Sequence, residues 1–289
     1  MNNSIIGKKT RVSDNILYAV IYGSAAISIL LLVGIMGYVF VRGISNVNLS
    51  FLTTVPSTIK GTFGIAGNIV NTLYIIFITL LFATPIGVGA AIYLNEYAKP
   101  GKVVSIIEFT TEVLSGIPSI IFGLFGMVFF GNVCGFGYSI LTGSFTLTLM
   151  VLPLITRNTQ EALKTVPESY RSGALGMGAT KWYMIRTILL PSAMPGIITG
   201  VILAVGRIVG ESAALLFTAG SGYLLPKAGI GFLNKIMESG GTLTIQLYLC
   251  MSKAQYGEAF GIALVLLVIV LLINMLTKYL SKKFDVSQG

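Results

Sequence analysis

Long apolar runs alternate with short polar segments along most of the chain. Six of these runs are long enough to cross the hydrocarbon core of a membrane as helices, which takes roughly 17–25 residues. They cover residues 16–41, 69–94, 113–130, 139–155, 188–217 and 259–280. The pattern predicts an all-α polytopic membrane protein with six transmembrane helices.

Two shorter segments beside these runs are less regular. Residues 103–112 carry Glu108 and Glu112 and predict an amphipathic lead into the third span. Residues 242–250 fit either a helix or a strand.

Glycine and proline interrupt the third and fifth spans. At residues 115–119 (SGIPS) either the helix breaks and leaves backbone N–H groups open to an anion, or small residues pack tightly against a neighbour. The spacings Gly196-x-x-x-Gly200 and Gly206-x-x-x-Gly210 predict close helix packing.

The basic residues set the orientation, because cytoplasmic segments of membrane proteins are enriched in Lys and Arg. With the N-terminus inside, the outer segments hold few of them: Arg42, Lys60, Lys227, Lys235 and Lys253. Apart from Arg207, which falls within a span, the other basic residues fall on the inner side. The sequence therefore predicts that both termini and the polar segment 161–191 lie in the cytoplasm.

Residues 161–191 form the longest segment without a hydrophobic span, and we call them the insert. Thr165, with Glu168 three residues on, predicts a capped helix start. Gly178 suits the end of that short helix, and Thr180 predicts a cap for the next one.

Tyr170, Ala174 and Met177 are spaced four and three apart within the insert. In a helix they share one face and form a small apolar surface. We interpret this face as a contact surface for a partner; a solvated loop between two helices is the alternative.

Arg207 and Glu211 are the unusual residues of the fifth span, four apart inside an apolar run. Each charge costs at least about 2.5 kcal/mol in a membrane, so both must face protein, water or each other. A guanidinium suits a tetrahedral oxyanion because its fork donates two hydrogen bonds at once. The functional interpretation is an anion-handling group in a translocation path, with Glu211 orienting Arg207; the structural alternative is an ion pair that fixes helix packing.

Composition excludes several function classes. Hydrophobic residues make up 54% of the chain and charged residues 10%, which excludes an ordinary soluble domain. The chain has a net charge of +9, but its basic residues lie at the ends of apolar runs rather than in one patch. This distribution argues against nucleic-acid binding.

The residue types that catalysis or metal binding would need are scarce. The chain has no histidine and no G-x-x-x-x-G-K-[ST] motif, so neither an enzyme active site nor a resident ATP site is predicted. Two cysteines, Cys134 and Cys250, are too few for a metal site, and we expect free thiols rather than a bridge between them. Any energy source must come from a gradient or another subunit.

The insert resembles the cytoplasmic loop of importer-type ABC permeases, whose pattern is E-A-A, then Gly, then I-x-L-P. Four residues match the later part of that pattern: Gly178, Ile188, Leu190 and Pro191. Ser172, Gly173 and Ala174 stand at the E-A-A positions, so the leading glutamate of the family is missing.

Longer motifs make the resemblance more specific. The segments LSGIPSIIFGLFG and LPSAMPGIITGVILAVGRIVGESAALLFTAG look like phosphate-specific ABC permeases, as does GNIVNTLYIIFITLLFATPIGVGAAIYLNEYA. The resemblance covers about residues 64–284. The ending LTIQLYL and the short first outer loop look more like the PstA-type subunit than its PstC-type partner.

The resemblance implies a type I ABC importer permease fold with a cytoplasmic coupling helix. It implies an N-terminal tail, helix and outer loop over 1–60, a permease core over 61–284 and a tail over 285–289. Implied partners are a PstC-type permease, two ATP-binding subunits that hold ATP and Mg²⁺, and an extracytoplasmic phosphate-binding protein.

The resemblance also assigns roles to single residues. The broken-helix interpretation of residues 115–119 places Ser115 and Ser119 in the substrate path. The resemblance places Arg207 and Glu211 there, with Ser212 where the family often has Thr. For coupling to the ATPase it implies Glu168, Tyr170, Arg171, Ser172, Gly173, Ala174, Gly178 and Ala179. Two alternatives stay open: an ABC permease for another oxyanion such as molybdate or phosphonate, and a gradient-driven anion transporter.

Overall fold

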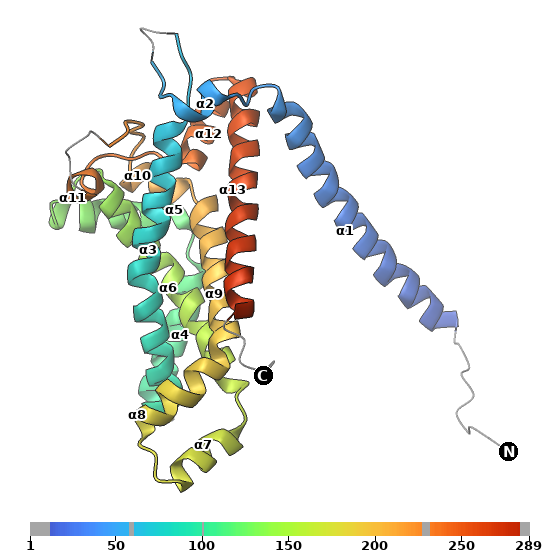
Figure 1. The fold of residues 1–289 in the computed structure, drawn as a ribbon, viewed down its shortest axis with the longest axis vertical. Helices are drawn as coiled ribbons and strands as arrows, with labels where there is room; N and C mark the ends of the chain where they lie inside the picture. Colours follow the sequence, from blue (N-terminus) through green and yellow to red (C-terminus); the bar gives the residue numbers. More distant parts are fainter. Residues whose placement is uncertain (1–11, 58–60, 100, 227–231, 284–289) are drawn as a thin grey trace.

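The computed structural model describes residues 12–57, 61–99, 101–226 and 232–283, and its regular elements there are helical (Figure 1). The predicted charges at Lys60 and Lys227 and the two tails lie outside the described residues. Five helical segments are long and apolar enough to cross a membrane, or up to six if one bent pair counts as a single span. The all-α layout of membrane-spanning helices is therefore confirmed.

The elements follow one another without any strand between them in the described ranges. They are α1 Val12–Ile44, α2 Leu49–Thr53, α3 Ala66–Ile92, η1 Tyr93–Tyr97, α4 Lys102–Gly116, α5 Ser119–Gly126, η2 Met127–Val133, α6 Ile140–Lys164, α7 Glu168–Gly176, α8 Lys181–Met184, η3 Ile185–Leu189, α9 Leu190–Gly210, α10 Ala213–Thr218, α11 Phe232–Ile236, α12 Leu243–Ser252 and α13 Tyr256–Lys283. The three elements labelled η are π-helical turns that continue a neighbouring helix.

Helices α3, α6 and α9 form the centre of the bundle, and α13 lies beside α9 (Figure 1). The middle of the core is built from aliphatic side chains of these helices, such as Ile75, Leu147, Ile155 and Ile208, all of them buried. Several buried threonines and serines of these helices bond to the backbone of their own helix, so they can lie within the apolar core. Thr148, for example, donates to the carbonyl of Ser144 one turn earlier.

Glycines let α9 approach α6 closely. A Cβ at Gly196 would lie 2.5 Å from the Cβ of Ala162, and one at Gly200 would lie 2.7 Å from the Cβ of Asn158. The predicted close packing at this pair is confirmed. Within this chain Gly206 and Gly210 do not pack closely, since an added Cβ at either would meet nothing within 4 Å.

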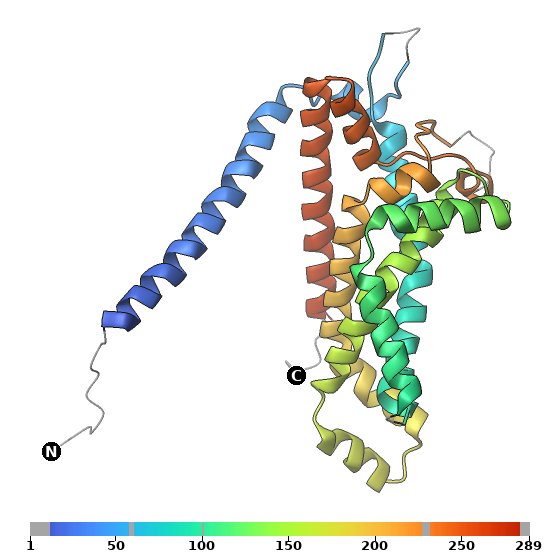
Figure 2. The ribbon, with the colours of Figure 1, turned by 180° about the vertical axis from the view of Figure 1, so that it is seen from behind.

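The third span differs from the prediction of one helix over 113–130. Helix α4 already begins at Lys102 and ends at Gly116, and the next helical segment, Ser119–Val133, is bent away from it by 101° (Figure 2). Of the two readings of residues 115–119, the broken helix is correct. Pro118 takes an extended backbone (φ −57°, ψ 137°), and an added Cβ at Gly116 would meet nothing within 4 Å.

The fifth span lies earlier in the chain than predicted, over Lys181–Gly210 rather than residues 188–217. Helix α9 ends at Gly210 rather than continuing to residue 217, because Glu211 is extended (φ −83°, ψ 123°) and a separate helix, α10, follows. The ambiguous segment 242–250 is helical and is capped by Thr242, whose side chain accepts a hydrogen bond from the N–H of Ile245.

Helix α1 stands apart from the rest of the bundle in both views (Figures 1 and 2). It contacts α13 near one end, where the Tyr38 and Phe260 rings meet edge to face at 5.6 Å and Gly43 lies against the Phe260 backbone. Along the rest of its length its apolar side chains are exposed, as expected of a helix surrounded by lipid or another subunit.

The close contact between α6 and α9 makes a stability prediction. Gly196→Ala should lower the free energy of unfolding by about 1–3 kcal/mol, because the new methyl group overlaps Ala162 and the helices must separate. The measurement is the Tm of the purified protein in detergent. Gly89→Ala is the matched control: it also lies within a helix, but its Cβ would meet nothing within 4 Å. Equal Tm changes for the two variants would contradict the prediction.

Candidate functional site

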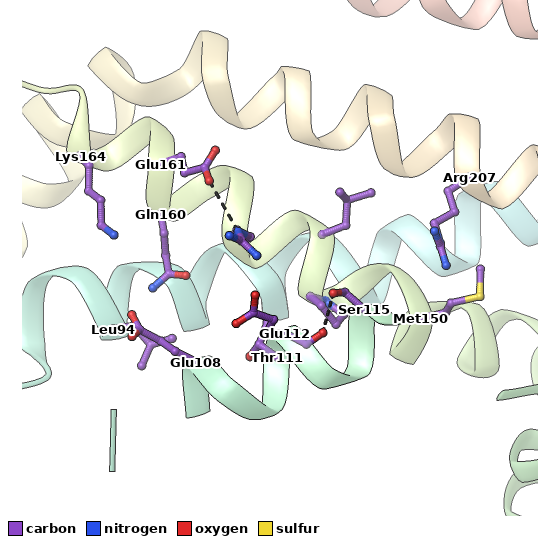
Figure 3. Close-up of a pocket in the computed structure, with 13 residues that line it drawn as sticks. Leu94, Glu108, Thr111, Glu112, Ser115, Met150, Gln160, Glu161, Lys164 and Arg207 are labelled. Carbon is purple, nitrogen blue, oxygen red and sulfur yellow. Dashed lines mark hydrogen bonds and ion pairs between the residues drawn. The ribbon is translucent and has the colours of Figure 1, made fainter. Parts of the chain in front are cut away.

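A polar cavity of about 490 Å³ lies between α4, α6 and the C-terminal half of α9 (Figure 3). It runs from Arg207, Ser115 and Met150 at one end to Leu94 and Lys164 at the other (Figure 3). The lining residues are Leu94, Glu108, Thr111, Glu112, Ser115, Met150, Pro153, Leu154, Arg157, Gln160, Glu161, Lys164 and Arg207.

Helix α4 contributes its polar face to the cavity. Glu108, Thr111, Glu112 and Ser115 follow the spacing i, i+3, i+4, i+7, which puts them in one row along a helix. Ser115 Oγ donates to the carbonyl of Glu112 at 2.7 Å, so its hydroxyl oxygen remains able to accept. No residue of α4 is buried in the single chain.

Helix α6 presents a row with the same spacing. Arg157, Gln160, Glu161 and Lys164 line the cavity from the last two turns of this helix. Arg157 Nε and Glu161 Oε1 are 3.7 Å apart, and both side chains are more than half exposed, so this pair contributes little to stability. The cavity therefore combines three cations with three carboxylates and several neutral polar side chains.

The structure brings together only two of the five residues predicted for the substrate path, Arg207 and Ser115. Glu211, Ser212 and Ser119 do not line the cavity. The predicted span over 188–217 would place Arg207 and Glu211 on one face of a single helix. This is wrong, because α9 ends between them at Gly210.

Glu211 has a different role in the structure. Its carboxylate oxygen Oε1 accepts a hydrogen bond from the N–H of Ala214 at 3.1 Å, which caps the first turn of α10. Its backbone carbonyl accepts from Thr244 Oγ1 at 3.0 Å. Within the described residues, no ion pair joins Glu211 to Arg207.

Sequence reasoning missed the polar rows on α4 and α6. Glu108 and Glu112 are four apart, and this spacing predicts an amphipathic segment that precedes the third span. In the structure, this segment and the start of the predicted span form one helix, α4. Arg157 lies just beyond the predicted end of the fourth span at residue 155, whereas Glu161 and Lys164 fall in the insert, so the predicted elements do not group the three residues in one helix. The four-residue spacings were the available signal.

The insert begins in the last turn of α6 and continues as two short helices, α7 and α8, at one end of the bundle (Figure 1). The end of the first, α7, is as predicted, since Gly178 takes a positive φ of +82°. Thr180 caps α8 by accepting from the N–H of Tyr183. The start is not as predicted: Thr165 is the C-cap of α6, and Pro167 precedes α7 without a side-chain cap.

The predicted apolar face of α7 is only partly exposed. Tyr170 and Met177 are open to solvent, with Met177 84% exposed. Ala174 is buried against Met184 and Ile185 in a small core at the end of the bundle. Leu175 and, on α8, Trp182 are exposed as well. With Tyr170 and Met177 they form an exposed apolar tip of the insert.

Arg171 points inward rather than toward a partner. Its Nε and Nη2 donate to Glu96 Oε1 at 3.3 and 3.2 Å, and its Nη1 and Nη2 donate to the carbonyls of Val166 and Leu163 at 2.9 Å. It also meets Glu168 at 3.3 Å. Lys181 donates to the carbonyl of Glu96 and lies 5.0 Å from the centre of the Tyr97 ring. Glu96 was not predicted as a functional residue.

Neither cysteine is in a disulfide: Cys134 is exposed and Cys250 is buried. The expectation of free thiols is confirmed.

Comparison with known proteins fits this architecture. Residues 83–286 match the family described as "Binding-protein-dependent transport system inner membrane component". The chain is 38% identical over 268 residues to the probable ABC transporter permease protein YqgI of Bacillus subtilis (strain 168), covering 89% of this chain and 90% of that protein. It is 35% identical over 180 residues to the phosphate transport system permease protein PstA of Xylella fastidiosa (strain Temecula1 / ATCC 700964), covering 62% of each.

A solved structure shares the fold. The match is to the crystal structure of a bacterial alginate ABC transporter in complex with an alginate pentasaccharide-bound periplasmic protein, with a TM-score of 0.69 and 17% identity over 95% of this chain and 96% of that one. The predicted type I importer permease fold is confirmed, and a permease of this kind works with an ATPase and a substrate-binding protein. The chain belongs to the binding-protein-dependent transport system inner membrane components and is the multi-pass permease subunit of an ABC importer.

Proposed function

We propose that this permease subunit belongs to an ATP-driven importer of inorganic phosphate and forms half of its translocation path. The observation that carries the proposal is Arg207, a guanidinium on a membrane span that lines the polar cavity. Its fork can donate two hydrogen bonds at once, which suits a tetrahedral oxyanion. The hydroxyls of Thr111 and Ser115 line the same cavity, and because each donates to a backbone carbonyl of α4, its oxygen can accept from a protonated oxyanion. The phosphate transport permease among its relatives supports phosphate as the anion.

The carboxylates of the cavity favour an oxyanion that still carries a proton. Glu108 and Glu112 line the cavity on the α4 side. At neutral pH, inorganic phosphate keeps at least one proton, which an ionised carboxylate can accept as a hydrogen bond. Molybdate has no such proton, so the same carboxylates would repel it.

The proposed assembly contains a PstC-type permease, two ATP-binding subunits and an extracytoplasmic phosphate-binding protein. In this assembly ATP and Mg²⁺ are bound and hydrolysed by the ATP-binding subunits, and this chain is not itself an enzyme. The open polar face of α4 supports a second permease, because such a subunit would close the path on the side where α4 buries nothing.

Both termini are proposed to lie in the cytoplasm. The start of α1, the end of α13 and the insert lie toward the same end of the bundle, which supports this orientation (Figure 1). In this arrangement the exposed tip around Tyr170 and Met177 seats on the ATPase. Closure of the ATPase dimer then moves the insert as a lever, and the path opens alternately outward and inward.

The role of Arg207 can be tested by phosphate uptake. Arg207→Ala should lower ATP-dependent uptake about 10–100-fold, since hydrogen bonds to a charged group are worth roughly 1.5–3 kcal/mol. Labelled phosphate is measured in proteoliposomes that contain the chain with its partner subunits. Arg42→Ala is the control, because Arg42 lies over the Tyr38 ring at the far end of α1. Normal uptake by Arg207→Ala would remove this residue from the path.

The lever role of the insert can be tested at Gly178. Its φ of +82° is costly for any residue with a Cβ, so Gly178→Val should distort the turn after α7 and lower phosphate uptake while ATP hydrolysis continues. Gly176→Ala is the control, because this neighbouring glycine has no positive φ and open space around its Cβ. Intact coupling in Gly178→Val would leave the insert without its assigned role.

Another oxyanion is the alternative substrate. Competition of labelled phosphate uptake by unlabelled phosphate, phosphonate and molybdate separates the cases. Competition by phosphate alone supports the proposal, whereas stronger competition by molybdate would contradict the argument from Glu108 and Glu112. Uptake that follows a membrane gradient and ignores ATP would contradict the ATP-driven mechanism.

A further inference from the structure

Both halves of the insert are attached to a single residue of the α3–η1 span, Glu96. Arg171 of α7 binds its carboxylate through two nitrogens, at 3.2 and 3.3 Å. Lys181, at the start of α8, binds its backbone carbonyl. Asn95 donates a further hydrogen bond to the same carboxylate oxygen at 2.7 Å.

Burial separates this contact from the other ion pairs of the insert and α6. The side chains of Arg171 and Glu96 are only 13% and 5% exposed, whereas that of Glu168, which also meets Arg171, is 82% exposed. An exposed pair yields easily to water and salt. Separating a buried pair leaves an uncompensated charge away from water, so Glu96 and Arg171 resist being pulled apart.

Arg171 is also bound to the end of α6. The carbonyls of Leu163 and Val166 each accept one of its hydrogen bonds at 2.9 Å. One side chain of α7 is therefore bonded to the inner ends of two spans. Both of these spans reach the cavity within a few residues of the contact, through Leu94 and Lys164.

We propose that Glu96 is the positioning residue that transmits movement of the insert to the spans that line the cavity. When the insert moves, the Glu96–Arg171 contact carries α3 along with α6, so the two spans shift together. Without the carboxylate, α7 stays attached to α6 but is released from α3. This inference rests on the proposed function, in which the insert is the lever driven by the ATPase.

The test uses the complete transporter, the chain with its partner subunits, in proteoliposomes. The measured quantity is phosphate taken up per ATP hydrolysed, together with the yield of assembled complex. Glu96→Gln keeps the size of the side chain and removes its charge, and it should lower the uptake per ATP at least tenfold while the complex still hydrolyses ATP. Glu238→Gln is the control: it also removes the carboxylate of an ion pair, here with Lys235, in a segment remote from the insert. It should leave the ratio within about twofold of the unaltered protein.

Glu96→Asp is a second variant that keeps the charge and moves the carboxylate back by one methylene. It should assemble even if Glu96→Gln does not, and its uptake per ATP should lie between those of the unaltered protein and Glu96→Gln. An assembled Glu96→Gln or Glu96→Asp complex with an unchanged ratio would overturn the inference. So would a loss in Glu238→Gln as large as that in Glu96→Gln.

A failure of the phosphate assignment would look different. The unaltered protein would then hydrolyse ATP and take up no phosphate. The role of Glu96 is then tested by ATP hydrolysis with and without the substrate-binding protein. Glu96→Gln should abolish the increase in hydrolysis that this protein causes. An undiminished increase would overturn the inference whatever the substrate.

Discussion

Helix α6 lies between α3 and α9, and its contact with α9 is close enough that no side chain fits at Gly196 or Gly200. Between helices in lipid the hydrophobic effect supplies no attraction, so association depends on such packing. This contact holds α9 against one side of α6 and leaves the row Arg157–Lys164 facing α4. The cavity, and the bonds that attach the insert, both depend on the position of α6.

The breaks in two spans follow from the same arrangement. Irregular backbone at membrane depth is tolerated only where protein or a polar cavity covers it. The helices that follow the two breaks, α5 and α10, pack against each other, with Gly123 so close to Ala214 that an added Cβ would lie 2.8 Å from its Cα. The carbonyl of Thr218 at the end of α10 accepts from the N–H of Ser139. The two helices therefore cover each other next to the places where the chain leaves helical geometry.

At the other end of the bundle, buried and exposed residues divide the insert into two parts. Arg171 and Ala174 face the spans and attach the insert to them, whereas Tyr170 and Met177 face outward. In the proposed coupling role, the insert needs both a surface for the ATPase and a stiff attachment to its own subunit. Arg171 of α7 provides that attachment through its hydrogen bonds to Glu96 and to two carbonyls at the end of α6.

The membrane-spanning helices, the insert and the unusual position of Arg207 within a span can be predicted from the sequence, because these depend on the length of apolar runs, on turn residues and on the cost of a charge among apolar neighbours. The sequence did not determine that the fifth span stops at Gly210 or that α4 continues through residues 103–112. Local spacing cannot show where a break will be covered by another helix. The bond between Glu96 and Arg171 joins residues 75 positions apart. Only the tertiary structure brings them together, since no spacing within one helix relates them.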